Sequence, residues 1–512
     1  MAFTTFAAID VGSNELSLKL FQISKKNGIE ELEYIRHATY LGSYSYKHKK
    51  ICSELVNEIC EVLEQFQKKM EEYQITDYVA YATSAIREAS NSVLILDQIK
   101  LRTGIKVKIL SNSEQRFLCY KAIALKVEAF QKIIQNGTAI VDVGSGSIQI
   151  SLFQDGCLSQ THNIKLGSLR IQELLSSMED KTDNFHKLIS EYIDNELITF
   201  QELFLQEQKI EQVIATGDQL NLFLHITSQK AGSAPINAKS LNQVFESLLS
   251  RPLEELTRHV SFPKEQVSLL IPTAMIYLKL FKQIRAKEIY LTEITLCDGI
   301  AAEYAQRKEK IQSEHDFAND ILCSARKIAS RYHCNQAHIE NVNSLALSIF
   351  DSIRKLHGLG KRERLLLEIA IILHSCGDFI DLTHSRENSY HIILSTEIIG
   401  LSHKEREMIA ELVRYTPKTF PSFSLNMDST SKENYIKLSK LFAIFVIANA
   451  LDKSHKQKFS NVKISYRQNV LTITTDTVED ITLESGLFQE KASFFEEVYG
   501  IKPYIKQKRR FS

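Results

Sequence analysis

Two segments of the chain alternate apolar and polar residues in the same way. The apolar residues at every second position are Leu16, Leu18 and Leu20 in the first segment and Ile148, Ile150 and Leu152 in the second. A period of two is typical of a strand that buries one face. The first segment runs into Asn27-Gly28 and the second into Asp155-Gly156. These pairs favour the positive φ of tight turns, so each segment predicts a β-hairpin.

A similar short motif stands directly before each predicted hairpin. The two copies read Ala8-Ile9-Asp10-Val11-Gly12-Ser13-Asn14 and Ala139-Ile140-Val141-Asp142-Val143-Gly144-Ser145-Gly146-Ser147. Between them the pattern predicts a helix over 53–73 and strands over 78–82 and 105–110. A repeat of this kind indicates two lobes of one design, and the mixture of helices and strands indicates α/β architecture.

The pattern changes at about residue 310, after which strand signals are missing for some 150 residues. Apolar residues with helical spacing lead instead to a stop at Gly358-Leu359-Gly360. A hairpin over 462–473 and a helix near 490–499 follow. We therefore predict four domains: lobe I (1–125), lobe II (126–305), an all-helical domain (310–458) and a small C-terminal α+β domain (459–512).

The amino-acid composition, and the net charge in particular, indicates which classes of binding partner to expect. The 512 residues are 44% hydrophobic and carry 62 basic and 62 acidic side chains, so the formal net charge is zero. A chain without a net field does not attract polyanions as a whole, so no nucleic-acid partner is expected and an anionic substrate needs local groups. The eight cysteines form no C-x-x-C pair, which is typical of core thiols in a reducing compartment.

The sequence pattern also indicates neither a signal peptide nor a membrane-spanning helix. Asp10 and Glu15 interrupt the first apolar segment, which does not fit a signal peptide. The longest uninterrupted apolar run, 441–448, is far shorter than the roughly 20 residues of a membrane-spanning helix. We expect a cytoplasmic protein without a membrane partner.

The two repeated motifs carry the candidate chemistry. A loop of small residues after a strand lets backbone N–H groups converge on an anion, and glycine permits its close approach. An aspartate at the end of each strand can hold Mg²⁺, which prefers oxygen ligands. We predict a phosphate clamp with Asp10 and Asp142 at the metal, and the phosphate-binding residues of the two loops are Gly12, Ser13, Asn14, Gly144, Ser145, Gly146 and Ser147.

Four further motifs accompany the two repeats, namely Ala82-Thr83-Ser84-Ala85-Ile86-Arg87-Glu88-Ala89, Leu166-Gly167-Ser168-Leu169-Arg170, Ala215-Thr216-Gly217-Asp218 and Ile271-Pro272-Thr273-Ala274. Through these motifs, residues 5–305 resemble the exopolyphosphatase / guanosine pentaphosphate phosphohydrolase (Ppx/GppA) family. The resemblance implies two actin-like (RNase H-like, ASKHA) lobes followed by an HD-like helical domain. It also implies Mg²⁺-dependent release of terminal orthophosphate from polyphosphate or guanosine pentaphosphate, and a homodimer.

The resemblance assigns further residues to the site. The arginine of the second motif, Arg87, is expected near the phosphates, where a guanidinium grips phosphate oxygens in a fork. The catalytic glutamate of the family falls in Ser111-Asn112-Ser113-Glu114-Gln115-Arg116. Ungapped comparison places Gln115 there, whereas matching the following arginine places Glu114 there. We assign the general base to Glu114 and keep Gln115 as the alternative, because an amide orients water but accepts no proton.

Three positions depart from the family pattern. Gln149 stands where much of the family has a glutamate, which weakens metal binding, and Ser145 replaces a glycine. In the helical domain, His338, His374 and Asp452 resemble HD metal ligands, but Ser375 replaces the central aspartate. Serine is a poor ligand for a divalent metal, so we expect core histidines there and no second metal site.

Two other functions fit parts of the pattern. An actin-like ATPase or sugar kinase needs a glycine-rich adenosine motif, whereas residues 215–220 contain a single glycine. A regulatory protein that binds polyphosphate or alarmone nucleotides, with turnover weakened through Gln115 and Gln149, is the stronger alternative. Release of phosphate from long-chain polyphosphate distinguishes such a regulator from an enzyme.

Overall fold

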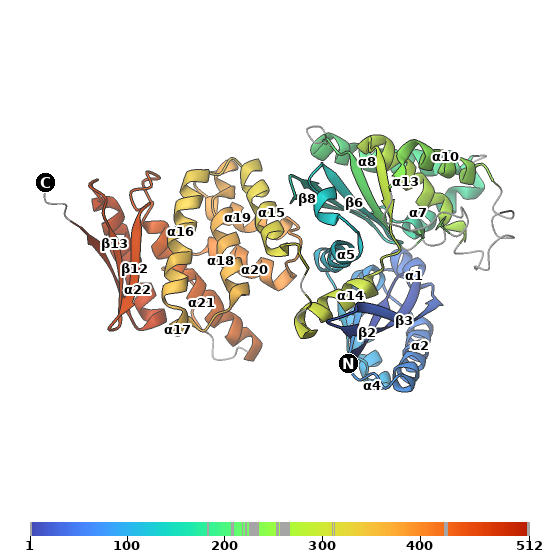
Figure 1. Ribbon diagram of the computed structural model, residues 1–512, viewed down its shortest axis with the longest axis horizontal. Helices are drawn as coiled ribbons and strands as arrows, with labels where there is room; N and C mark the ends of the chain where they lie inside the picture. Colours follow the sequence, from blue (N-terminus) through green and yellow to red (C-terminus); the bar gives the residue numbers. More distant parts are fainter. Residues whose placement is uncertain are drawn as a thin grey trace. The chain divides into compact units, whose positions relative to one another are not determined.

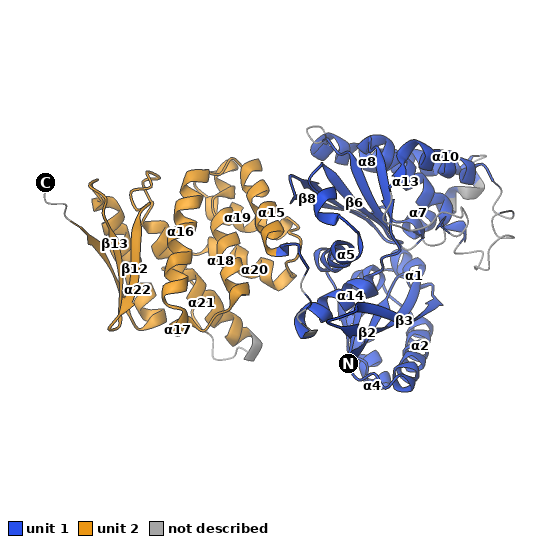
Figure 2. Cartoon of the chain, in the orientation of Figure 1, with its two compact units in different colours: residues 1–317 blue, residues 318–512 orange. Residues whose placement is uncertain are grey.

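The computed structural model describes residues 3–181, 184–205, 209–217, 219–220, 223–224, 235–251, 255, 267–309, 311, 313–423 and 429–508. The chain folds into two compact units, Met1–Phe317 and Ala318–Ser512 (Figure 2). The first unit contains both predicted lobes, and the second contains the predicted helical and C-terminal domains. Within the described ranges, no helix is both long enough and apolar enough to cross a membrane.

The first lobe is a five-stranded mixed sheet with the strand order β3-β2-β1-β4-β5 (Figure 1). Its strands are β1 (Thr4–Val11), β2 (Glu15–Ser24), β3 (Gly28–Ala38), β4 (Tyr78–Ala82) and β5 (Val107–Ile109). β2 is antiparallel to β1 and β3, whereas β1, β4 and β5 are parallel. Gly28 has a φ of 76° at the hairpin turn, a conformation that glycine adopts without strain. The helices of this part of the chain are α1 (Leu41–His48), α2 (Ser53–Glu72), α3 (Ser84–Glu88), α4 (Ser92–Thr103) and α5 (Asn112–Lys126).

The second lobe repeats this topology. Its sheet has the order β10-β11-β9-β6-β7-β8, and the stretch β8-β7-β6-β9-β11 has the same strand directions as the whole first sheet. The strands are β6 (Thr138–Val143), β7 (Ile148–Gln154), β8 (Cys157–Ile164), β9 (Gln212–Thr216), β10 (Ile236–Asn237) and β11 (Glu288–Leu291). The helices include α6 (Phe130–Ile133), α7 (Ser168–Leu175), α8 (Phe185–Phe200), α10 (Ala238–Leu249) and α13 (Leu270–Ile284). The repeat seen in the sequence is thus a repeat of the fold.

One helix crosses from the second lobe back to the first. α14 (Leu296–Tyr304) follows β11 in the chain but packs against β1 and α5. Its Cys297, Ile300 and Ala301 share a buried cluster with Phe6 and Ala8 of β1. The helix lies within the range predicted for lobe II (126–305), yet it packs on elements of the first lobe. This packing links the end of the second lobe to the first lobe.

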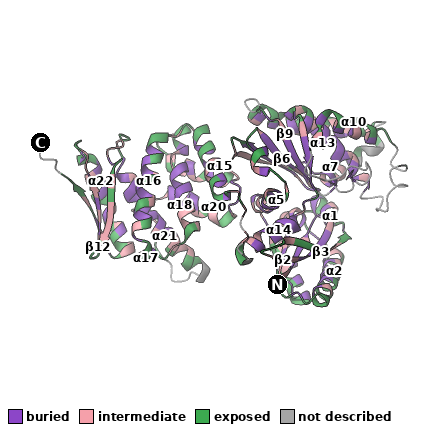
Figure 3. Cartoon of the chain, viewed as in Figure 1, coloured by how far each residue is buried: buried purple, intermediate pink, exposed green. Residues whose placement is uncertain are grey.

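The second unit consists of helices followed by a small sheet (Figure 1). The helices are α15 (Phe317–Arg331), α16 (Gln336–Ser352), α17 (Arg354–His357), α18 (Lys361–Leu373), α19 (Ser385–Ser395), α20 (His403–Arg414) and α21 (Ser429–Ala450), with a short 3-10 turn η4 (Cys376–Phe379) after α18. The sheet has the order β12-β13-β14, formed by β12 (Val462–Arg467), β13 (Val470–Thr475) and β14 (Lys502–Gln507), and α22 (Thr482–Tyr499) packs on α21. Buried residues concentrate where these helices face one another (Figure 3).

Candidate functional site

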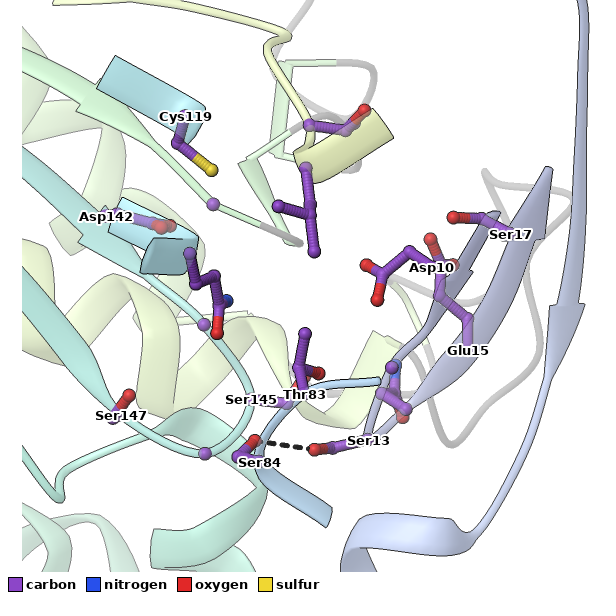
Figure 4. A pocket seen from close by; sticks show the side chains of 18 of the residues that line it. Asp10, Ser13, Glu15, Ser17, Thr83, Ser84, Cys119, Asp142, Ser145 and Ser147 are labelled. Atoms are coloured by element: carbon purple, nitrogen blue, oxygen red, sulfur yellow. Dashed lines mark hydrogen bonds between the residues drawn. The ribbon is translucent and has the colours of Figure 1, made fainter. Parts of the chain in front are cut away.

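A cleft opens between the two lobes at the ends of β1 and β6. Asp10 and Asp142, one from each strand, lie on opposite sides of it (Figure 4). Gly217, which follows β9, also lines the cleft with a φ of 148°. A Cβ atom on Gly217 would lie 2.2 Å from the carbonyl oxygen of Val143, so the close approach of these two chain segments requires glycine.

The two predicted phosphate loops have the same backbone turn. The N–H of Gly12 donates to the carbonyl of Glu15 at 3.0 Å, and the N–H of Gly144 donates to that of Ser147 at 3.0 Å. The strand register is also equivalent, because Asp10 pairs with Ser17 and Asp142 pairs with Gln149. Each repeat therefore presents one carboxylate, one small-residue loop and one polar side chain. All seven predicted phosphate-loop residues line the cleft, namely Gly12, Ser13, Asn14, Gly144, Ser145, Gly146 and Ser147.

A network of hydroxyl groups fixes the first loop. Tyr46 on α1 donates to Ser13 Oγ at 2.8 Å, and the backbone N–H of Ala85 donates to the same atom at 3.1 Å. Ser84 Oγ lies 2.8 Å from Ser13 Oγ (Figure 4). The second loop packs on this network, because a Cβ on Gly146 would lie 2.3 Å from the Tyr46 hydroxyl and 2.6 Å from Ser84 Oγ. The small residues of one loop thus set the distance between the lobes.

Arg170 links the lobes at the same point. Its Nε donates to the carbonyl of Gly146 at 2.8 Å, and its Nη2 lies 2.6 Å from a carboxylate oxygen of Glu88 at the end of α3. The guanidinium also lies 4.0 Å from the centre of the Tyr46 ring, within the range of a cation–π contact. These contacts hold the second loop beside the elements that support the first loop.

The start of α5 decides between Glu114 and Gln115. Glu114 forms a capping box in which one carboxylate oxygen accepts from the backbone N–H of Ser111 at 3.0 Å and from its hydroxyl at 2.6 Å. Gln115 lines the cleft, whereas Glu114 does not belong to the lining residues. The geometry thus favours Gln115 over Glu114 as the side chain at the cleft, and the catalytic role of either residue stays a prediction. The sequence contains the signal, since a serine followed three residues later by glutamate is typical of a helix start.

Arg87 is also outside the cleft lining. Its guanidinium donates to the carbonyl of Leu110 at 2.7 Å and to the side-chain oxygen of Asn112. It therefore joins α3 to the loop before α5 and contributes to the position of that helix. The guanidinium that lines the cleft is that of Arg36 on β3, which lies over the ring of Tyr34 at 5.2 Å. No sequence motif pointed to Arg36.

The charges of the cleft favour a cation. Three carboxylates, those of Asp10, Glu15 and Asp142, line it together with the guanidinium of Arg36. The pKa of the nearby Cys297 thiol is raised, first by burial and second by the negative charge of Asp10. The charge of the cleft therefore extends to its buried surroundings. A phosphate chain entering this cleft would meet an excess of negative charge, which a bound cation would neutralise.

Gln149 and the two aspartates fit a hard cation. Gln149 is buried in the cleft, and its Oε1 accepts no hydrogen bond within the described part of the chain. A buried oxygen of this kind is available to a ligand. Among the described residues, no three His, Cys, Asp or Glu side chains form a metal-binding group. Mg²⁺ does not require such a group, because it commonly binds one or two carboxylates, water and substrate phosphates.

The candidate HD residues of the second unit form a closed cluster instead. His338 Nδ1 lies 2.8 Å from Asp452 Oδ2, and the backbone N–H of Gln457 donates to Asp452 Oδ1 at 2.7 Å. His374 Nδ1 lies 2.6 Å from the carbonyl of Ile371, and the ring of His455 stacks on that of His338. Burial lowers the pKa of His374 to about 3. His338 and Asp452 are buried, His374 is partly exposed and His455 is exposed, and the contacts of the two predicted histidines, His338 and His374, are those of structural histidines.

Other residues that line the cleft were missed by the sequence analysis as site residues. They are Glu15, Ser17, Tyr34, Arg36, Thr83, Ser84, Cys119, Gly217, Ile294, Thr295 and Leu296. Thr83 and Ser84 belong to a motif that was recognised, and Thr295 begins α14 with a capping box to Asp298. Asp218, the last residue of another recognised motif, lies outside the described residues.

Comparison with known proteins agrees with this arrangement. The family model of the Ppx/GppA phosphatase family matches residues 22–308, and that of Ppx/GppA phosphatase, domain III, matches residues 322–490. A guanosine-5'-triphosphate,3'-diphosphate pyrophosphatase of Photobacterium profundum is 20% identical over 92% of this chain and 91% of its own length. Exopolyphosphatase 1 of Mycobacterium leprae is 21% identical over 45% of this chain and 67% of its own length.

Solved structures show the same fold for 60% of the chain. An exopolyphosphatase from Cytophaga hutchinsonii aligns with 60% of this chain and 99% of its own, with a TM-score of 0.52 and 15% identity. An Aquifex aeolicus member of the Ppx/GppA family aligns with 60% of this chain and 99% of its own, with a TM-score of 0.50 and 18% identity. Since the first family model covers more than half of the residues, the chain belongs to the Ppx/GppA phosphatase family.

Proposed function

We propose that this protein is a phosphohydrolase that releases terminal orthophosphate from linear polyphosphate, or the 5′-phosphate of guanosine pentaphosphate, in the cleft between its lobes. The observation that carries the proposal is the pair of equivalent loops, each with an aspartate, that line one cleft from opposite sides. The names of the similar proteins, an exopolyphosphatase and a guanosine-5'-triphosphate,3'-diphosphate pyrophosphatase, support the choice of substrates.

The residues of the cleft have different roles in the proposed hydrolysis. Backbone N–H groups and hydroxyls of the two loops hold the terminal phosphate, and Arg36 contacts an adjacent phosphate. Asp10 and Asp142, with the amide oxygen of Gln149, would hold Mg²⁺, which neutralises charge on the phosphate oxygens when bound. Phosphoryl transfer depends mainly on such positioning and neutralisation.

Gln115 is proposed to orient the attacking water. The water attacks the terminal phosphorus, the bond to the bridging oxygen breaks, and the shortened chain leaves. An amide can align the water by hydrogen bonding but accepts no proton, so the proton leaves to a phosphate oxygen or to solvent. Turnover is therefore expected to be slower than with a carboxylate at the same place, because general-base catalysis contributes about 10²–10⁴-fold.

A direct assay tests the proposal. The full chain is incubated with long-chain polyphosphate or with guanosine pentaphosphate in Mg²⁺, and released orthophosphate is measured, with EDTA as control. Release that requires Mg²⁺ supports the proposal and identifies the preferred substrate. No release above background from either substrate contradicts it.

A regulatory protein is the second candidate, and one observation favours it. The only acidic residue near the start of α5, Glu114, is engaged in the capping box, while the amide of Gln115 faces the cleft. Such a protein would bind polyphosphate or alarmone nucleotides with little turnover. Binding measured by calorimetry, together with no release in the assay above, would identify it. A homodimer remains a prediction from the family resemblance.

A further inference from the structure

Two cysteines that are distant in the sequence meet in the second unit. The sulfur atoms of Cys334 and Cys376 lie 3.5 Å apart. Cys334 is in the turn between α15 and α16, and Cys376 begins the turn η4 after α18. Both are free thiols, and the proposed cleft chemistry uses neither.

Rigid backbone turns hold both thiols in place. The N–H of Cys334 donates to the carbonyl of Ala329 at 3.0 Å, and the side chain of Asn335 caps α16 directly after it. Beside Cys376, the N–H of Gly377 donates to Ser389 Oγ at 2.8 Å. A Cβ on Gly377 would lie 2.0 Å from the carbonyl of Ser385, so this turn packs closely on α19. The contact between the sulfurs is thus set by the fold.

The two thiols differ in exposure. Cys334 is partly exposed, whereas Cys376 is fully buried. The hydrogen bond between the two thiols also lowers the pKa of Cys334, which increases the thiolate fraction at the accessible partner. The accessible cysteine can therefore meet an oxidant in solution while the buried one can be reached by its neighbour alone.

We propose that Cys334 and Cys376 are a redox modification site that forms a reversible intrachain disulfide. A disulfide bond is about 2.05 Å long, so the sulfurs need to approach by about 1.5 Å. The oxidant is a low-molecular-weight disulfide such as glutathione disulfide. The Cys334 thiolate attacks one of its sulfurs and releases one glutathione thiolate, which takes up the proton that Cys334 lost.

The second step closes the bond. Cys376 loses its proton and attacks the Cys334 sulfur of the mixed disulfide, and the second glutathione leaves and takes up that proton. In sum, two protein thiols are oxidised to a disulfide and one glutathione disulfide is reduced to two thiols. The bond would join the α15–α16 turn to η4, next to the cluster of His338 and His374.

Peptide mapping of the full chain tests this site without any substitution. The protein is treated with glutathione disulfide, remaining thiols are alkylated, and the non-reduced digest is analysed by mass spectrometry. We expect a peptide pair linked through Cys334 and Cys376, formed at least about tenfold faster than glutathione addition to the partly exposed Cys52. The absence of this linked pair, while Cys52 reacts, would overturn the proposal.

Two matched variants test the order of the steps. In Cys376→Ser we expect stable glutathione addition at Cys334, because the second step is missing. In Cys334→Ser we expect Cys376 to stay unmodified in the folded protein, because it is buried. Addition at Cys376 of Cys334→Ser at the wild-type rate would overturn the proposed role of Cys334 as the attacking thiol.

Discussion

The cleft of the first unit and the histidine cluster of the second unit both contain buried polar groups. The two sites differ in whether these groups form hydrogen bonds within the chain. In the cluster, Asp452 accepts from the N–H of Gln457 and contacts His338, and His374 contacts a backbone carbonyl. In the cleft, Gln149 Oε1 is buried without a hydrogen bond from the described residues. Buried polar groups that the chain satisfies itself stabilise a fold, whereas unsatisfied ones are available to a ligand.

The cleft and the histidine cluster both contain residue types that can bind a metal, but their surroundings differ. The cleft has an excess of carboxylates, glycines that let the loops approach closely, and an amide oxygen to which no described residue donates a hydrogen bond. The cluster supplies its own hydrogen bonds, so a metal would have to displace existing contacts. We therefore expect metal-dependent effects from substitutions in the cleft and stability effects from substitutions in the cluster.

The largest effect is expected from the cleft aspartates. Asp10→Ala and Asp142→Ala should each lower phosphate release by about 10³-fold and raise the Mg²⁺ concentration required, because metal neutralisation contributes several kcal/mol. The measurement is a Mg²⁺ titration of phosphate release. Asp97→Ala, an exposed position on α4, is the control and should behave like the wild type. Unchanged Mg²⁺ dependence in both cleft variants would remove these residues from the metal site.

In the cluster, Asp452→Ala should lower the free energy of unfolding of the second unit by about 1–3 kcal/mol, because it removes the buried acceptor that the Gln457 N–H and the His338 ring contact. Urea unfolding followed by circular dichroism measures this. The exposed pair of Asp351 and Arg364 supplies the control, and Asp351→Ala should cost less than about 1 kcal/mol. Equal losses from the two substitutions would contradict the closed cluster.

We expect the stability of the second unit to fall at acidic pH because of the lowered pKa of His374. Burial lowers its pKa to about 3, so below the unfolded pKa of about 6.5 the unfolded chain binds a proton that the folded chain does not. Stability should then fall by about 2 kcal/mol between pH 7 and pH 5. Near pH 4 and below, the lowered pKa of Asp452 adds a loss in the same direction. Urea midpoints of wild type and His374→Leu measure the effect, and an unchanged slope in the variant would contradict it.

At the start of α5, Gln115→Ala should slow phosphate release by about tenfold, because it removes one hydrogen bond of about 1.4 kcal/mol to the attacking water. Gln115→Glu should accelerate release, since a carboxylate also accepts a proton. Glu114→Gln is the matched control and should alter turnover less than Gln115→Ala does. A larger loss in Glu114→Gln would restore Glu114 as the catalytic residue.

The smallest effect is expected from the capping box. Glu114→Ala should lower stability by about 1 kcal/mol, since it removes the acceptor for the Ser111 N–H. A double-mutant cycle with Ser111→Ala in urea unfolding isolates the interaction. Additive losses in the cycle would show that the two side chains do not stabilise each other.

The sequence predicted the repeated part of the fold because its signals are local. Alternating apolar residues and a turn pair define each hairpin, and the two sheets share one strand order. The return of α14 to the first lobe could not be predicted, because an apolar helix face does not specify which sheet it covers. The contact of Cys334 with Cys376 is likewise non-local.

The candidate site was predicted in part for the same reason. The loop residues and aspartates follow strands directly, so their place at the strand ends was evident. Successive residues of a helix point about 100° apart, so a shift of one residue exchanges Glu114 with Gln115. The capping signature of Ser111 could have resolved this shift. The directions of the Arg87 and Arg36 side chains depend on tertiary contacts, which the sequence does not display.

We expect metal and phosphate to bind in the cleft between the lobes, and not at the histidine cluster. The most direct test is a crystal structure with Mn²⁺ and a non-hydrolysable polyphosphate analogue, with the metal located by anomalous scattering. We expect the metal beside Asp10, Asp142 and Gln149, with the terminal phosphate on the loops of Gly12 and Gly144. A metal found at His338 and Asp452, with none in the cleft, would contradict the account.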